Sequence, residues 1–185
     1  MIRIIAGSAR GTVLAAPKGM NTRPTLGRTR ESIFNVLANV GLAETKVLDI
    51  FAGTGALGLE ALSRGAAEAV LIDQATGKLI AENARRCHAE GCVRILAKDA
   101  ERALRSLAGE TFDYIFLDPP YRKGYVNRIL SLVVELGLPA DGSIIIAEHV
   151  SSEPLDLTGI GDRVSLWKEK RAGETAVTYL LYKTC

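Results

Sequence analysis

Hydrophobic and polar positions follow two periods along most of this chain. From residue 46 onward, short apolar runs rich in β-branched residues alternate with stretches in which apolar residues recur at helical spacing. This alternation is typical of βαβ units, in which helices cover a parallel sheet. The predicted strands are Lys46–Phe51, Ala69–Asp73, Val93–Ala97, Tyr114–Leu117 and Ser143–Glu148. The predicted helices are Leu57–Ser63, Thr76–Glu90, Ala100–Leu107 and Tyr125–Leu136.

The two ends of the chain depart from this alternation. After residue 160, Arg163–Lys168 and Ala176–Lys183 form two successive strand patterns around Gly173, which predicts an antiparallel hairpin at the sheet edge. Before residue 41 the pattern is irregular and turn-rich, and it ends in apolar residues at helical spacing. The elements expected there are a small β-hairpin of strands Met1–Ala6 and Thr12–Ala15, a loop Pro17–Pro24, and a helix capped by Thr25 or Thr29 and ended by Gly41.

Composition limits the class of protein. The chain has 185 residues, of which 48% are hydrophobic and 24% charged, as expected of one globular domain rather than a disordered chain. Its apolar runs are far shorter than the ~18 residues that a membrane-spanning helix needs, and no secretory signal is visible. Three cysteines are an odd number, which favours free thiols. We therefore expect a cytoplasmic protein, by default a monomer.

Charge is distributed unevenly along the chain. Residues 1–35 contain six basic residues and one acidic residue, whereas the remaining 150 contain 17 basic and 20 acidic residues. A basic segment on a near-neutral body indicates either a phosphate-binding surface or a solvated face. We divide the chain into a basic N-terminal extension, residues 1–40, and a main domain, residues 41–185. The basic residues of the extension are Arg3, Arg10, Lys18, Arg23, Arg28 and Arg30.

A glycine motif follows the first strand of the main domain. Gly53, Gly55 and Gly58 fit G-x-G-x-x-G between a predicted strand and a predicted helix, and Asp73 follows Gly53 by 20 residues. The pattern is shared by sites for dinucleotides and for S-adenosylmethionine. Asp49 distinguishes the two, because a carboxylate there disfavours a pyrophosphate and favours a cationic amine or sulfonium. A role only as a helix cap stays open for Asp73 and for Asp99, since both directly precede predicted helices.

The tetrapeptide Asp118-Pro119-Pro120-Tyr121 is suited to holding an amino group. Two prolines remove amide donors, so the backbone presents carbonyl acceptors, and Asp118 adds another acceptor. An exocyclic NH₂ could donate to Asp118 and to the Pro119 carbonyl, and Tyr121 could stack on the base. A turn that ends the strand is the simpler interpretation.

The segment from Val47 to Gly58 resembles the first motif of class I S-adenosylmethionine-dependent methyltransferases. The resemblance implies a Rossmann-like fold with a mostly parallel seven-stranded sheet, helices on both faces and S-adenosylmethionine as cofactor. In that family Asp73 would hold the ribose hydroxyls, and Asp99 and Ala100 would face the adenine amine. The full set of expected cofactor-binding residues is Asp49, Phe51, Ala52, Gly53, Gly55, Asp73, Gln74, Asp99 and Ala100.

The tetrapeptide and the N-terminal segment together resemble the RsmD family. The segment carries Arg3 to Gly7, Arg10-Gly11, Arg23-Pro24-Thr25, Arg28, Arg30-Glu31 and Phe34-Asn35. The resemblance implies methylation of guanine N2 in 16S ribosomal RNA of an assembling small subunit. It makes Asp118, Pro119, Pro120 and Tyr121 the catalytic residues. The basic extension, together with Arg122 and Lys123, would then hold RNA phosphates.

Other functions remain as alternatives. The same chemistry could serve DNA adenine N6 or a protein glutamine, although the chain shows no target-recognition segment. A nicotinamide-dependent oxidoreductase would explain the glycines but not the tetrapeptide, and a non-catalytic RNA-binding module would explain only the basic extension. Cys87, His88 and Cys92 are too few for a structural zinc site, so we expect no metal.

Overall fold

A seven-stranded sheet forms the centre of the molecule. The chain is described from a computed structural model that covers residues 1–17, 24–121 and 124–184. Most strand positions are buried, as expected for a sheet covered on both faces. The strands of the sheet are Lys46–Ile50 (β3), Glu68–Ile72 (β4), Val93–Leu96 (β5), Phe112–Leu117 (β6), Pro139–Val150 (β7), Val164–Ala172 (β8) and Thr175–Tyr182 (β9).

The order of the strands is β5-β4-β3-β6-β7-β9-β8. The first five of these are parallel, while β9 runs antiparallel to β7 and to the edge strand β8. The predicted fold class is therefore confirmed, including the C-terminal hairpin. From β3 the chain first builds outward to β5 and then crosses to β6, so the strand order reverses between β3 and β6. Ligands of open α/β sheets bind at this reversal, beyond the carboxyl ends of the strands.

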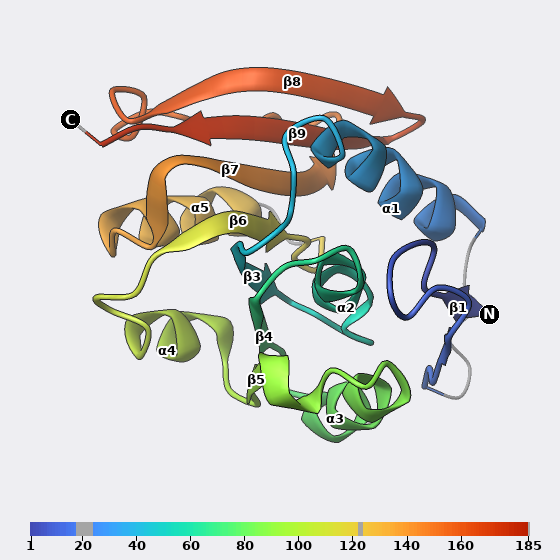
Figure 1. Cartoon of the computed structure of the whole chain (residues 1–185). Coiled ribbons are helices and arrows are strands. Elements are labelled where there is room, and N and C mark those ends of the chain that lie inside the picture. The colour runs from blue at the N-terminus through green and yellow to red at the C-terminus, as the bar shows by residue number, and fades with distance from the viewer. Residues whose placement is uncertain (18–23, 122–123, 185) are drawn as a thin grey trace.

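Helices cover both faces of the sheet, as Figure 1 shows. The helices are Pro24–Leu37 (α1), Ala56–Ser63 (α2), Gly77–Arg86 (α3), Ala100–Arg105 (α4) and Tyr125–Glu135 (α5), with a 3₁₀ turn at Glu90–Cys92 (η1). One apolar cluster lies between the sheet and α1, α2 and α3, with Phe34, Ala61 and Ile80 among its members. The other lies between the sheet and α4 and α5, with Leu104 and Ile129 among its members. Among the described residues, no helix is long and apolar enough to cross a membrane.

Some predicted boundaries were wrong. The strand predicted at Ser143–Glu148 spans the 12 residues Pro139–Val150, because its polar start continues the ladder with β6 and its end pairs with β9. The helix predicted at Thr76–Glu90 ends at Arg86, and His88 behind it has a positive φ of 54°. Both errors come from tertiary pairing and local backbone geometry that residue periodicity does not reveal.

The N-terminal extension packs against α2 and α3. Its strands, Ile2–Arg3 (β1) and Val13–Leu14 (β2), are two residues each, shorter than predicted, and pair antiparallel. Ile4 and Leu14 pack on Leu59 in a third apolar cluster. The helix α1 begins at Pro24, not at Thr25 or Thr29, and proline is favoured at this first helical position because its missing N–H needs no partner there.

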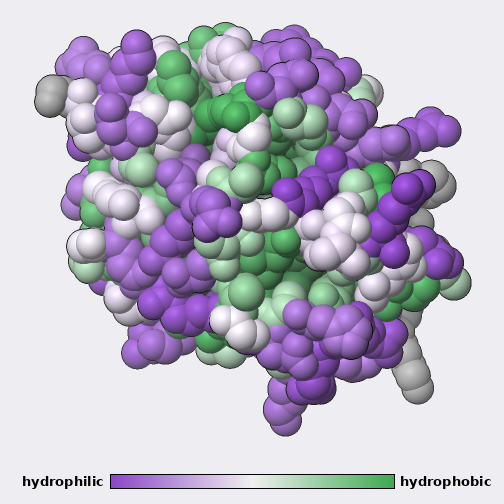
Figure 2. Space-filling model, in the orientation of Figure 1, coloured by the Kyte–Doolittle hydropathy of each residue, from purple (hydrophilic) through white to green (hydrophobic). Residues whose placement is uncertain are grey.

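Buried side chains of α2 and α3 fix this extension by hydrogen bonds. The Glu60 carboxylate accepts the N–H groups of Ile5 (2.7 Å) and Ala6 (3.0 Å). Asn83 Oδ1 accepts the Ala15 N–H, while its Nδ2 donates to the carbonyls of Ala15 and Thr54. Asn83 therefore links the extension directly to the glycine loop. Figure 2 shows the surface of the molecule from the same side as Figure 1. On this side, apolar side chains occupy the middle and polar side chains surround them.

Candidate active site

The glycine motif forms the turn between β3 and α2. Gly53 and Gly55 have positive φ angles of 58° and 80°, which glycine adopts without strain. Gly58 lies in α2, where a Cβ would stand 3.0 Å from Leu71 and 3.3 Å from Asp49 Oδ2. Asp49 is buried and accepts the Gly58 N–H at 2.9 Å. The third glycine therefore permits close packing of helix on sheet, and the first two shape the loop.

Two acids at the ends of neighbouring strands border this loop. Asp73 Oδ2 accepts the Gly53 N–H at 3.0 Å, and its Oδ1 accepts the N–H groups of Ala75 and Thr76. Asp99 caps α4, accepting from Glu101 and Arg102 through Oδ1. The capping role considered from the sequence is therefore present at Asp99, whereas Asp73 bonds the loop before α3, whose N-cap is Thr76. Both acids also line a cavity.

A cavity of about 440 Å³ opens beyond the carboxyl ends of β3, β4, β5 and β6. Phe51, Asp73, Gln74, Asp99 and Ala100 line it, so the structure brings together five of the residues that the sequence assigned to a cofactor. Ala52, Gly53 and Gly55 lie in the adjoining turn, and Asp49 lies in β3 just before it. Sequence reasoning missed three lining residues, which flank predicted ones in the chain or begin the helix after the tetrapeptide: Ile72, Lys98 and Tyr125.

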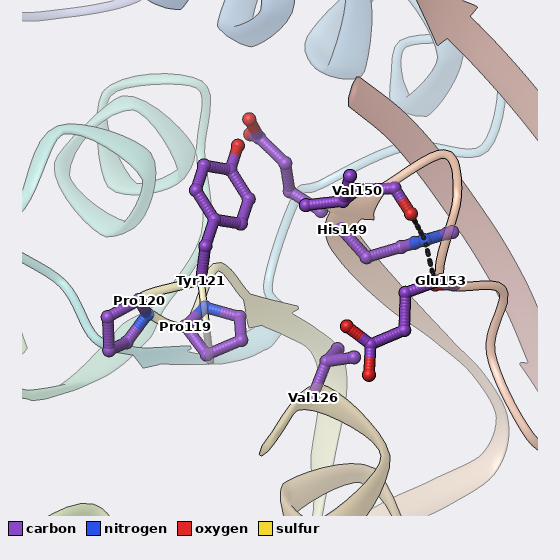
Figure 3. Close-up of a pocket in the computed structure, with 8 residues that line it drawn as sticks. Pro119, Pro120, Tyr121, Val126, His149, Val150 and Glu153 are labelled. Carbon is purple, nitrogen blue, oxygen red and sulfur yellow. Dashed lines mark hydrogen bonds between the residues drawn. The ribbon is translucent and has the colours of Figure 1, made fainter. Parts of the chain in front are cut away.

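The tetrapeptide separates this cavity from a smaller one. Asp118 and Pro120 line the larger cavity, while Pro119, Pro120 and Tyr121 line a pocket of about 20 Å³. Figure 3 shows the two prolines and Tyr121 on one side of this pocket, facing the end of β7. A group held in the small pocket is therefore next to a ligand held in the large one.

Three carboxyl groups near this junction have raised pKa values. Burial raises the pKa of Asp49 to about 7, against the effect of the Gly58 N–H and with a contribution from the charge of Asp73. Burial raises the pKa of Asp118 to about 8, helped by the charges of Glu148 and Asp49. The pKa of Glu148 is also raised by burial, while a hydrogen bond with Tyr121 opposes the shift. Buried carboxyl groups with raised pKa values favour a ligand that brings positive charge or N–H donors.

Glu148 was not among the predicted site residues. It stands at the carboxyl end of a strand, where the sequence placed Asp49, Asp73, Asp99 and Asp118, so the same rule applied to β7 would have found it. His149 next to it is buried, and its ring nitrogens bond with Thr178 and with the carbonyls of Val150 and Glu153 (Figure 3).

The predicted RNA-contacting residues fall into two groups. Arg3, Arg10 and Arg28 are exposed, whereas Arg30 is buried and its guanidinium donates to the Arg3 carbonyl. Arg30 therefore makes a contact within the extension, and burial lowers its pKa. Four further predicted residues lie outside the described part of the chain: Lys18, Arg23, Arg122 and Lys123.

Comparisons with known proteins agree with this architecture. The model of a family described as conserved hypothetical protein 95 matches residues 2–181. Ribosomal RNA small subunit methyltransferase D of Escherichia coli K12 is 40% identical over 184 residues, covering 98% of this chain and 89% of that protein. Its counterpart in Haemophilus influenzae is 31% identical over 186 residues, covering 98% and 93%. The solved structure of yhhF from Escherichia coli superimposes with a TM-score of 0.87 at 38% identity, covering 98% of both chains.

Proposed function

The chain belongs to the conserved hypothetical protein 95 family, the RsmD family of methyltransferases, and from this premise we propose that it methylates the N2 amino group of a guanine in 16S ribosomal RNA. Methylation of ribosomal RNA from S-adenosylmethionine follows from its relatives. The finer assignment, to guanine N2 of the small subunit, is supported by the tetrapeptide and the acids around it. The observation that carries it is the position of Asp118–Tyr121 between the two cavities.

The large cavity fits S-adenosylmethionine by its chemistry. Buried Asp49 suits a positive charge, and Asp73 offers carboxylate oxygens to a ribose diol. Phe51 and Tyr125, whose ring centroids are 5.5 Å apart, provide an aromatic wall for an adenine. A Cβ at Gly53 would meet nothing within 4 Å, so the loop is open on that side. When bound, the cofactor supplies an electrophilic methyl group.

The tetrapeptide orients the amino group that receives the methyl. The carbonyl of Pro119 and the carboxylate of Asp118 accept its N–H groups and turn the nitrogen lone pair toward the large cavity. Guanine N2 is a weak nucleophile because its lone pair is delocalised into the ring. Asp118 takes the proton, a role for which its raised pKa of about 8 makes it a stronger base than an ordinary aspartate. Exposed Tyr121 stacks on the base.

The N-terminal extension, residues 1–40, is the proposed RNA-contacting part, and residues 41–185 form the catalytic domain. Arg3, Arg10 and Arg28 present positive charge at the surface of the extension. These charges suit phosphates, which fix orientation without reading sequence. The buried Arg30 guanidinium donates to the Arg3 carbonyl and so fixes the backbone that carries the Arg3 side chain.

Transfer of labelled methyl from S-adenosylmethionine to small ribosomal subunits tests this function. The subunits come from cells that lack the protein, and nuclease digestion identifies the product. We expect N2-methylguanosine, reduced by about 10²–10⁴-fold in Asp118→Asn. Asp156→Asn, which removes an exposed acid, is the matched control with full activity. Label in another nucleoside, in DNA or in a protein amide would refute the guanine assignment.

A further inference from the structure

A second carboxyl group reaches the small pocket from the end of β7. Glu148 lines this pocket together with Pro119, Pro120 and Tyr121. The Tyr121 hydroxyl hydrogen-bonds with Glu148, and the charge of Glu148 acts directly on Asp118. Two acids from different strands therefore converge where the amino group of the substrate would lie.

The polar side chains next to Glu148 already form hydrogen bonds within the protein. His149 is buried and bonds through both ring nitrogens. Glu153, also on this pocket, accepts the N–H of Gly124 at the start of α5. The partner of Glu148, in contrast, is Tyr121, a side chain that is 63% exposed. A bond to such an exposed hydroxyl is readily exchanged for a bond to a ligand.

Two adjacent acceptors, Asp118 and Glu148, match the N1–N2 edge of guanine. Guanine presents N1–H beside its N2 amino group, so two neighbouring ring positions carry donors. Adenine and cytosine present their amino groups beside a ring nitrogen that is itself an acceptor. A carboxylate opposite that nitrogen would repel its lone pair, whereas opposite guanine N1–H it accepts a hydrogen bond.

We propose that Glu148 selects guanine, its carboxylate accepting the N1–H while Asp118 and the Pro119 carbonyl accept the N–H groups of N2. The proposal rests on the function proposed above and adds the residue that distinguishes guanine from adenine and cytosine. Glu148 touches the substrate in this arrangement, and its hydrogen bond with Tyr121 also positions that ring. The selection is both attractive, toward N1–H, and repulsive, against a ring-nitrogen lone pair.

A substrate with 2-aminopurine at the methylated position tests the proposal. This base keeps the 2-amino group but has a lone pair in place of N1–H. The wild-type enzyme should methylate it roughly 10–100-fold less efficiently than guanine in the same RNA. In Glu148→Gln the amide can donate to the purine N1. The preference for guanine, measured as a ratio of kcat/KM values, should therefore shrink at least tenfold, with unchanged affinity for S-adenosylmethionine.

Glu174→Gln is the matched control, because it removes the same charge at the exposed turn between β8 and β9. It should keep the wild-type preference. An unchanged preference in Glu148→Gln would overturn the proposal, as would a wild-type enzyme that methylates both bases within about threefold, a result that needs no folded variant. If the wild type gave no N2-methylguanosine at all, the proposed function would fail first and remove the basis of this inference with it.

Discussion

The contact between the N-terminal extension and α2, and the rim formed by the carboxyl ends of the parallel strands, both bury carboxyl groups, but in different surroundings. Glu60, which is fully buried, accepts N–H groups from Ile5 and Ala6 and pairs with Arg64 at 2.8 Å. Asp118 lines the large cavity and Glu148 lines the small pocket, close enough for the charge of Glu148 to act on Asp118, and burial raises the pKa of both. A buried acid with complete protein donors fixes the fold, whereas a pair of acids without them favours a ligand that supplies donors.

Removing the charge of Glu60 should have the largest effect on stability. Glu60→Gln keeps the size of the side chain but places an NH₂ where an oxygen now accepts, and it leaves Arg64 without its partner. The free energy of unfolding should fall by about 3 kcal/mol. Urea denaturation measures it. Glu82→Gln breaks an exposed pair with Arg86 and should cost less than about 0.5 kcal/mol. Equal losses in the two variants would contradict the anchoring role of Glu60.

The opposite behaviour is expected of Asp49 in the rim. Asp49→Asn keeps an acceptor for the Gly58 N–H but removes the charge that suits a cationic cofactor. Affinity for S-adenosylmethionine should fall roughly 10–100-fold, as expected for loss of one charge-assisted contact. Stability without cofactor should be retained at pH 8, where the wild-type acid is buried and ionised. Isothermal titration and thermal denaturation separate the two effects, and an unchanged cofactor affinity would remove Asp49 from the site.

This contrast also explains what the sequence could predict. The rim acids Asp49, Asp73, Asp99 and Asp118 follow strands directly, so local pattern and the geometry of parallel sheets place them together. Glu60 and Asn83 lie inside helices, and their partners in the extension are 54 to 68 residues away in the chain. No local pattern encodes such pairs. Glu148 is an intermediate case. The local pattern predicted that a strand ends at Glu148, but its contact with Tyr121 depends on tertiary packing.

The free energy of unfolding as a function of pH distinguishes the buried acid Asp118 from acids that have protein donors. The folded-state pKa of Asp118 is raised to about 8, above an unfolded value near 4. Its contribution to stability is therefore fully present below about pH 4 and is lost as pH rises through about 8. Relative to wild type, Asp118→Asn should therefore gain stability steadily between pH 5 and pH 8, by up to about 1.4 kcal/mol per pH unit, and gain little more above pH 8. Urea denaturation at pH 5, 7 and 9 tests this.

Glu110 provides the control of opposite sign. Hydrogen bonds from Arg94 and Lys46 lower its pKa to about 2, so its contribution is present above its unfolded pKa and lost only as pH falls toward 2. Glu110→Gln should therefore lose the same stability at pH 5, 7 and 9. A pH-independent difference for Asp118→Asn would show that its folded pKa is not raised.

The smallest effect is expected at the surface of the extension. Arg28 is exposed in α1, so its replacement should leave the fold and the cofactor affinity unchanged. If Arg28 contacts one phosphate, Arg28→Ala should reduce the slope of log K for RNA binding against log salt concentration by about 0.7–0.9. Arg105→Ala, exposed at the end of α4 and away from the extension, should keep the wild-type slope. Equal slopes for all three proteins would mean that Arg28 belongs to a solvated face. In that case the hydrogen bonds of Glu60 and Asn83 would still fix the position of the extension. Fixing the extension does not itself require a basic surface, so its role would not include this phosphate contact.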